Sequence, residues 1–168
     1  VYYSVGWMKR YTEILCKIYA TRVVNPMSTI IVRPSNVYGP CDDFDPRTSH
    51  MLASLVRRVV ERQNPMEIWG TGEDVRDLIY VDDFVDGLLA AAQTDSQHLS
   101  VNVASGYSCS VKEALATALE VEGFPDVEVR YDETKPSTVP VRTVDTRLAT
   151  KLLGLDTPIP LREGIART

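Results

Sequence analysis

The sequence predicts an α/β fold with strands and helices alternating along one domain, and three observations predict it. Apolar residues recur at helical spacing over residues 4–22, with no proline among them. Thr29 to Arg33 is a short run rich in β-branched residues, which is typical of a buried strand. The two patterns then alternate along the chain, and such alternation favours at least some parallel strand pairing.

The remaining elements follow from breaks and caps in the sequence. Pro34 to Pro46 is predicted to be a long loop, and Ser49 is expected to cap a helix that Asn64-Pro65 ends. Further strands are expected at residues 66–69, 78–81, 101–103 and 126–131. Further helices are expected to begin at Asp82 or Asp83, at Ser110, at Asp145 and within residues 161–168.

Composition limits the class of protein. The 168 residues are 44% hydrophobic and 24% charged, which is typical of one soluble domain with a real core. The formal net charge of −5 gives no general basic surface, so we expect no nucleic-acid partner. Three scattered cysteines indicate reduced thiols rather than a disulfide frame or a metal site. The reduced thiols lead us to expect a cytoplasmic protein, and because no apolar run approaches membrane-spanning length we expect no membrane partner. Val1 does not look like a natural start, and the last residues begin a helix, so we expect a fragment.

The loop after the first strand is one candidate binding segment. In open α/β sheets, ligands bind beyond the carboxyl ends of the strands, where Pro34 to Pro40 lies. Asn36 could present its amide to a ligand carbonyl or phosphate. Alternatively Asn36 bonds its own turn, and spacing alone favours that alternative.

The helix expected after Ser49 carries a second candidate pair. His50 and Arg58 are eight residues apart, which is roughly 80° around and about 12 Å along an ideal helix. His50 could act as a general acid, and Arg58 could hold a diphosphate through its planar fork. The alternative for each is a solvated surface side chain.

Two further segments carry weaker signals. Trp69-Gly70-Thr71-Gly72 precedes Arg76, and glycines let a backbone approach a ligand closely while Arg76 could contact phosphate. Asp132 and Lys135 follow an expected exposed strand, where a loop could close over a substrate. Most such glycine pairs are simple turns, and most such charges are surface residues.

In this order and spacing, the motifs resemble those of the extended short-chain dehydrogenase/reductases that act on nucleotide sugars, the NAD-dependent epimerase/dehydratase family. The resemblance covers essentially the whole chain. It implies the C-terminal part of a doubly wound Rossmann-type parallel sheet plus a small mixed α/β substrate-binding domain, with the Rossmann part at about 1–40 and the second at about 41–168. The motifs are Val32 to Pro40, Ile68 to Gly72, Arg76 to Asp83, Asn102 to Gly106 and Leu152 to Gly154.

The resemblance also implies roles for individual residues. Lys9 and His50 match catalytic positions. The positions expected beside an NAD or NADP cofactor are Lys9, Pro34, Asn36, Val37 and His50. The positions expected to hold the nucleotide diphosphate sugar are Arg58, Trp69, Arg76, Asp132 and Lys135.

Gly39 to Pro46 followed by Ser49-His50 is most similar to the GDP-L-fucose synthase subfamily, which couples epimerisation to NADPH-dependent reduction. Family members commonly form homodimers, so Met8 to Ile18 is expected to face a partner.

Two departures from the family pattern bear on catalysis. The family has Tyr-x-x-x-Lys on one helical face, yet Val5 stands in the tyrosine position. Tyr3 precedes Lys9 by six residues, which places the two roughly 240° apart around an ideal helix. Tyr3 therefore does not simply replace the missing tyrosine. No glycine-rich phosphate loop is present either. Three readings stay open: an enzyme part, a nucleotide-sugar-binding member without catalysis, and a structural α/β domain.

Overall fold

The computed structural model describes residues 3–135, 139–155 and 157–168. Its helices are α1 (Tyr3–Thr21), α2 (Met51–Val60), α3 (Val81–Ala92), α4 (Val111–Glu122), α5 (Arg147–Leu153) and α6 (Leu161–Arg167). Its strands are β1 (Thr29–Pro34), β2 (Asn36–Tyr38), β3 (Met66–Trp69), β4 (Val75–Tyr80), β5 (His98–Val103), β6 (Ser108–Ser110), β7 (Val129–Asp132) and β8 (Val141–Arg142).

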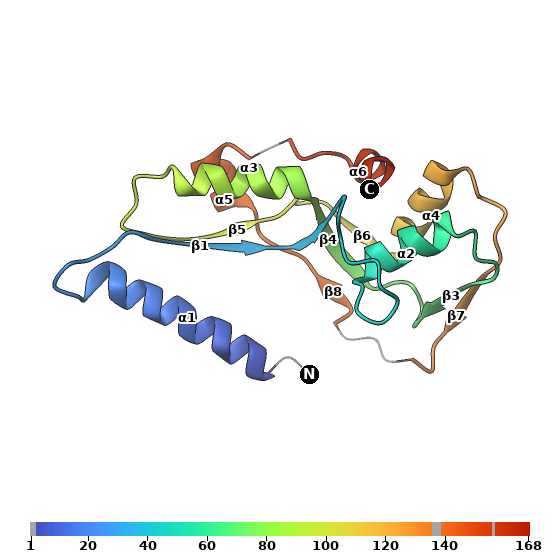
Figure 1. Cartoon of the computed structure of the whole chain (residues 1–168), viewed down its shortest axis with the longest axis horizontal. Helices are drawn as coiled ribbons and strands as arrows, with labels where there is room; N and C mark the ends of the chain where they lie inside the picture. The colour runs from blue at the N-terminus through green and yellow to red at the C-terminus, as the bar shows by residue number, and fades with distance from the viewer. Residues whose placement is uncertain (1–2, 136–138, 156) are drawn as a thin grey trace.

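One half of the structure is built on the parallel pair β1–β5, whose register runs from Thr29↔His98 to Pro34↔Val103. Helix α1 lies on one face of this pair, and α3 and α5 lie on the other (Figure 1). The apolar core on the α3 side includes Val101 and Val103, which are fully buried. The alternation of apolar runs thus yields the parallel pairing that the sequence predicts.

The other half surrounds β4, which pairs in parallel with β2 and β8 and antiparallel with β6. A separate parallel pair, β3–β7, lies further from β1 (Figure 1). Helices α2, α4 and α6 close a second core, in which Val59 and Met66 are fully buried. Helix α4 begins with a complete capping box between Ser110 and Glu113, which confirms the cap predicted at Ser110.

A single residue joins the two halves along the first strand. β1 ends at Pro34 and β2 begins at Asn36, so Ser35 alone carries the chain from one sheet to the other. The Ser35 amide still donates to the Val103 carbonyl at 3.2 Å, which extends the β1–β5 pairing past Pro34. Asn36 then pairs with Leu78 of β4.

The structure corrects several sequence-based expectations. The segment predicted as one long loop contains β2, and the strands β6 and β8 are not foreseen at all. These strands have two or three residues, too few to show a period-2 pattern. The strand expected at residues 126–131 is β7, at Val129–Asp132. The N-cap of α2 is His50 rather than Ser49, and the one before α5 is Thr146 rather than Asp145.

Candidate functional site

A cavity of about 530 Å³ lies where the two halves meet, beyond the end of β1. It brings together segments that are far apart in the sequence. Its lining contains Asn36 and Val37 of β2, His50 at the start of α2, Arg76 of β4 and Arg142 of β8. Four of these five are residues that the sequence singles out.

Asn36 is held in place by its neighbour strand. Its Nδ2 donates to the backbone oxygen of Asp77 at 2.8 Å, so its amide bonds across the sheet rather than within its own turn. This leaves the Asn36 side-chain oxygen to accept from a ligand. The Ser35 hydroxyl lines the same cavity and is buried without a hydrogen-bond partner among the described residues. Buried polar atoms of this kind are normally satisfied, which fits a site that a polar ligand completes.

Arg76 is fixed by three hydrogen bonds. Its Nη1 donates to the carbonyl oxygens of Val75 at 2.8 Å and Val139 at 2.7 Å, and its Nη2 donates to Asp74 Oδ2 at 3.0 Å. The Arg76 side chain is 12% exposed. A guanidinium held this firmly loses little entropy when it binds an anion.

Arg142 is a cavity-lining residue that the sequence alone does not single out. It reaches the cavity because β8 pairs with β4, which sets Arg142 directly opposite Arg76 in the register. No carboxylate is among the described residues that line the cavity. The pair of arginines therefore makes this cavity suited to an anionic ligand such as a diphosphate.

His50 lies at the entrance to α2. It is the N-cap residue, in an extended conformation, and its side chain makes no capping hydrogen bond. The exposed imidazole is consequently available to a ligand in the cavity. The structure does not place Arg58 beside it. Arg58 is half-buried near the other end of α2, where its Nε donates to Gln63 Oε1 at 2.9 Å and burial lowers its pKa.

Trp69, Asp132 and Lys135 form a second cluster at the ends of β3 and β7. The Lys135 Nζ lies 5.7 Å from the centre of the Trp69 ring, a cation–π arrangement. Trp69 pairs with Asp132 in the register, and the Gly70 amide donates to the Asp132 carbonyl at 2.8 Å. Hydrogen bonds from the Thr134 side chain and backbone lower the pKa of Asp132. Trp69 is 69% exposed, so it offers a flat apolar surface.

Lys9 lies on α1, outside the lining of the cavity. Its side chain is exposed and has no ion-pair or hydrogen-bond partner among the described residues. Helix α1 runs antiparallel to β1, so the end that carries Lys9 lies toward the end of β1 that carries Pro34 (Figure 1). Val5 is 52% exposed and Tyr3 is 78% exposed, with the Tyr3 ring turned edge-on to Trp7.

These residues fit one end of a nicotinamide cofactor. The Asn36 side-chain oxygen and the orphan Ser35 hydroxyl supply polar partners, and Lys9 of α1 supplies a cation that has no partner among the described residues. The pyrophosphate end finds no glycine-rich loop in this sequence.

Comparison with known proteins places these features in a family. Residues 4–104 match the model of the NAD dependent epimerase/dehydratase family. The chain is 34% identical over 158 residues to a probable GDP-L-fucose synthase 1 from Oryza sativa, covering 92% of this chain and 47% of that protein. It is 31% identical over 160 residues to dTDP-4-dehydro-6-deoxy-D-allose reductase from Streptomyces bikiniensis, covering 95% of this chain and 47% of that protein. The chain thus spans about half the length of the curated relatives it matches.

Solved structures share the same fold. UDP-glucose 4-epimerase from Thermotoga maritima, solved with UDP-glucose, matches with a TM-score of 0.86 at 28% identity, over 97% of this chain and 51% of that one. MoeE5, solved with UDP-glucuronic acid and NAD, matches with a TM-score of 0.82 at 29% identity, over 96% and 52%. Within the described residues, no helix of this chain is long and apolar enough to cross a membrane.

Proposed function

This chain belongs to the NAD dependent epimerase/dehydratase family, and we propose that it binds the nucleotide diphosphate sugar for an enzyme of that family. The enzyme would be an NAD- or NADP-dependent epimerase, dehydratase or reductase similar to GDP-L-fucose synthase. The relatives with that name and the reductase from Streptomyces support this choice. Residues from about 41 onward would hold the sugar nucleotide, and the first 40 would complete the cofactor domain, interleaved with β5, α3 and α5, which pack on the β1 side.

The cavity at the junction of the two halves carries the proposal. Arg76 and Arg142 converge on it from neighbouring strands, and Arg76 is already held by three hydrogen bonds. Two guanidinium groups can bind a diphosphate in several bidentate ways, and preorganisation lowers the entropic cost of binding. Asn36 and His50 line the same cavity and would face the sugar and the cofactor.

We assign the reaction to residues on either side of this cavity. A bound nicotinamide cofactor would supply the hydride chemistry at a sugar carbon. Lys9 would hold the ribose next to the nicotinamide, Pro34 and Val37 would contact the ring, and His50 would exchange a proton with the sugar. Trp69, Asp132 and Lys135, at the ends of β3 and β7, would contact the nucleotide, and Arg58 on α2 would contribute positive charge.

A second candidate function rests on Val5. A valine cannot exchange a proton with the sugar hydroxyl, so the chain would bind nucleotide sugars without turning them over. The Val5 side chain is 52% exposed and carries no group that exchanges protons. Lys9, which has no partner in the part of the chain that the structure describes, favours the enzyme, because a binding protein gains little from a cation at that place.

The full-length protein, tested with NADH, NADPH and a panel of GDP-, UDP- and dTDP-sugars, separates these functions. Turnover of one sugar, abolished in Lys9→Ala and reduced about 100-fold in His50→Ala, is the result expected of the enzyme. Lys151→Ala, an exposed change on α5, is the matched control. Tight sugar-nucleotide binding without turnover would establish the second function. Absence of both binding and turnover would overturn both.

A further inference from the structure

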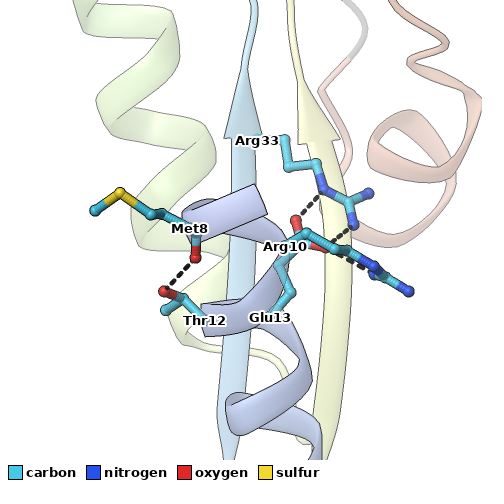
Figure 2. A network of polar contacts seen from close by, with 5 residues as sticks. All are labelled: Met8, Arg10, Thr12, Glu13 and Arg33. Carbon is cyan, nitrogen blue, oxygen red and sulfur yellow. Dashed lines mark hydrogen bonds and ion pairs between the residues drawn. The ribbon is translucent and has the colours of Figure 1, made fainter. Parts of the chain in front are cut away.

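Glu13 joins helix α1 to the end of β1 through a two-pronged ion pair. Its Oε1 accepts from Arg33 Nε at 2.6 Å and its Oε2 accepts from Arg33 Nη2 at 2.8 Å (Figure 2). Oε2 also accepts from Arg10 Nη1 at 3.0 Å, so the carboxylate lies between two guanidinium groups. Paired hydrogen bonds of this kind fix the relative orientation of their two groups, which a single contact does not.

The ion pair lies between two segments that are proposed to hold the cofactor. Arg33 is followed directly by Pro34. Lys9 precedes Glu13 by four residues, which puts it about 40° around and about 6 Å along the helix from Glu13. Since α1 runs antiparallel to β1, the step from Glu13 to Lys9 and the step from Arg33 to Pro34 lead in the same direction (Figure 1).

Few other hydrogen bonds among the described residues join α1 to the strands. Among the described residues, the other hydrogen bonds between α1 and the strands or the segment before β5 end at Cys16 and Ala20, in the second half of the helix. In the first half, large apolar side chains are exposed instead of packed, namely Tyr3, Val5, Trp7, Met8 and Tyr11. Among the described residues, the Glu13–Arg33 pair is therefore the side-chain link closest to Lys9 between α1 and β1.

We propose that Glu13 and Arg33 are positioning residues that hold Lys9 in register with Pro34, Asn36 and Val37 so that both sides meet one nicotinamide cofactor. The inference rests on the proposed function, because it needs a cofactor at this place. Neither residue touches the cofactor in this account. Glu13 acts through Lys9, and Arg33 acts through the backbone of the residue that follows it.

The test uses the full-length protein with Glu13→Gln, Arg33→Gln and the double variant. Glu13→Gln preserves size and removes the charge. The matched control is Glu120→Gln, which breaks the 3.2 Å pair with Arg162 between α4 and α6, away from α1 (Figure 1). Three quantities are measured: the Kd for NADH and NADPH, the Kd for the nucleotide sugar, and amide hydrogen exchange over residues 5–12 without cofactor.

We expect Glu13→Gln to raise the cofactor Kd about tenfold and leave the sugar-nucleotide Kd unchanged, since only the Lys9 side is displaced. Exchange over residues 5–12 should accelerate, while Glu120→Gln changes none of the three. The double variant should be no worse than either single variant, because the two residues act as one pair.

Several outcomes would overturn the inference. Wild-type cofactor affinity and exchange in Glu13→Gln would do so, as would an equal loss of cofactor and sugar-nucleotide binding, which indicates general unfolding. If Glu13→Gln does not fold, Arg33→Lys keeps the charge without the fork, and an unchanged cofactor Kd there refutes the pair. A wild-type protein that binds no NADH or NADPH refutes the proposed function itself, and this inference with it.

Discussion

Asp77 is buried in β4 with 1% of its surface exposed, and its carboxylate faces the loop after β5. Oδ1 accepts from the Ser105 amide at 3.1 Å and the Ser105 hydroxyl at 3.0 Å, and Oδ2 accepts from the Gly106 amide at 3.0 Å. Its backbone oxygen accepts from Asn36. One residue thus ties β4 to Asn36 and to the loop after β5, two of the places where the chain passes between the sheets.

Replacing this carboxylate should cost more than replacing an exposed one. We expect Asp77→Ala to lower the free energy of unfolding by about 3 kcal/mol, because two amides and a hydroxyl lose their buried acceptor. Asp95→Ala, at an exposed position, should change it by less than about 0.5 kcal/mol. Urea denaturation of both variants gives the comparison, and equal values would contradict this account of Asp77.

The Glu13 carboxylate should titrate unusually low. The hydrogen bonds from Arg33 lower its pKa from 4.5 to about 2, with Arg10 adding to the effect. A depressed folded-state pKa stabilises the fold above the unfolded value, so this contribution is complete above about pH 4.5 and is lost as the pH falls toward 2. Carboxyl-carbon NMR should find the midpoint near 2, and Arg33→Gln should raise it toward 4.5. An equal midpoint in both proteins would exclude the ion pair as the cause.

The sequence predicts well which residues belong to the candidate site, and less well which of them lie together in the structure. Asn36, His50 and Arg76 belong to recognisable motifs, and the structure brings them to one cavity. Arg142 carries no local signal, because its role depends on a two-residue strand pairing with β4. The helical spacing of His50 and Arg58 gives no shared site either, since His50 lies just outside α2 as its N-cap.

The elements that the sequence predicts best are those with the longest patterns. Helix α1 and strand β1 lie within one or two residues of their expected bounds, and α4 starts at its expected cap. Short strands depend on partners distant in sequence rather than on their own residues, which is why β2, β6 and β8 escape prediction.

Replacement by alanine should change the stability of the chain in opposite directions at two helical glycines. A Cβ at Gly87 in α3 would lie 2.6 Å from Val103 Cγ1 and 3.0 Å from Leu155 Cδ1, whereas a Cβ at Gly6 in α1 meets nothing within 4 Å. Gly87→Ala should therefore destabilise this chain by about 1–3 kcal/mol through overpacking. Gly6→Ala should stabilise it by up to about 1 kcal/mol through helix propensity. Thermal unfolding of both variants decides the point, and the same sign for both would contradict the packing described for α3.

At the scale of the whole molecule, the expected α/β class and family are confirmed by the parallel sheets and by the match over residues 4–104. Assembly of the molecule stays a prediction. The exposed apolar side chains of α1, Met8 and Tyr11 among them, lie on a face that no described element covers.

We predict that this face forms a homodimer in the full-length protein. Tyr11→Glu should shift the mass measured by sedimentation equilibrium from dimer toward monomer, because burying a carboxylate in an apolar interface is costly. Val24→Glu, at a 97% exposed position after α1, is the control and should leave the dimer intact. A monomeric wild-type protein, or a Tyr11→Glu dimer of unchanged affinity, would refute the prediction.

The single residue between β1 and β2 has a consequence for how such a chain can vary in evolution. Arg33 is paired with Asn102 on one side of Ser35, and Asn36 is paired with Leu78 on the other. An insertion or deletion between them would shift one of the two registers, and a shift of one residue turns every side chain of that strand to the opposite face. The stretch from Asp42 to Thr48, by contrast, forms no strand pairs, so a change in its length shifts no register. Length variation among homologues should therefore gather after Cys41 and be absent at Ser35.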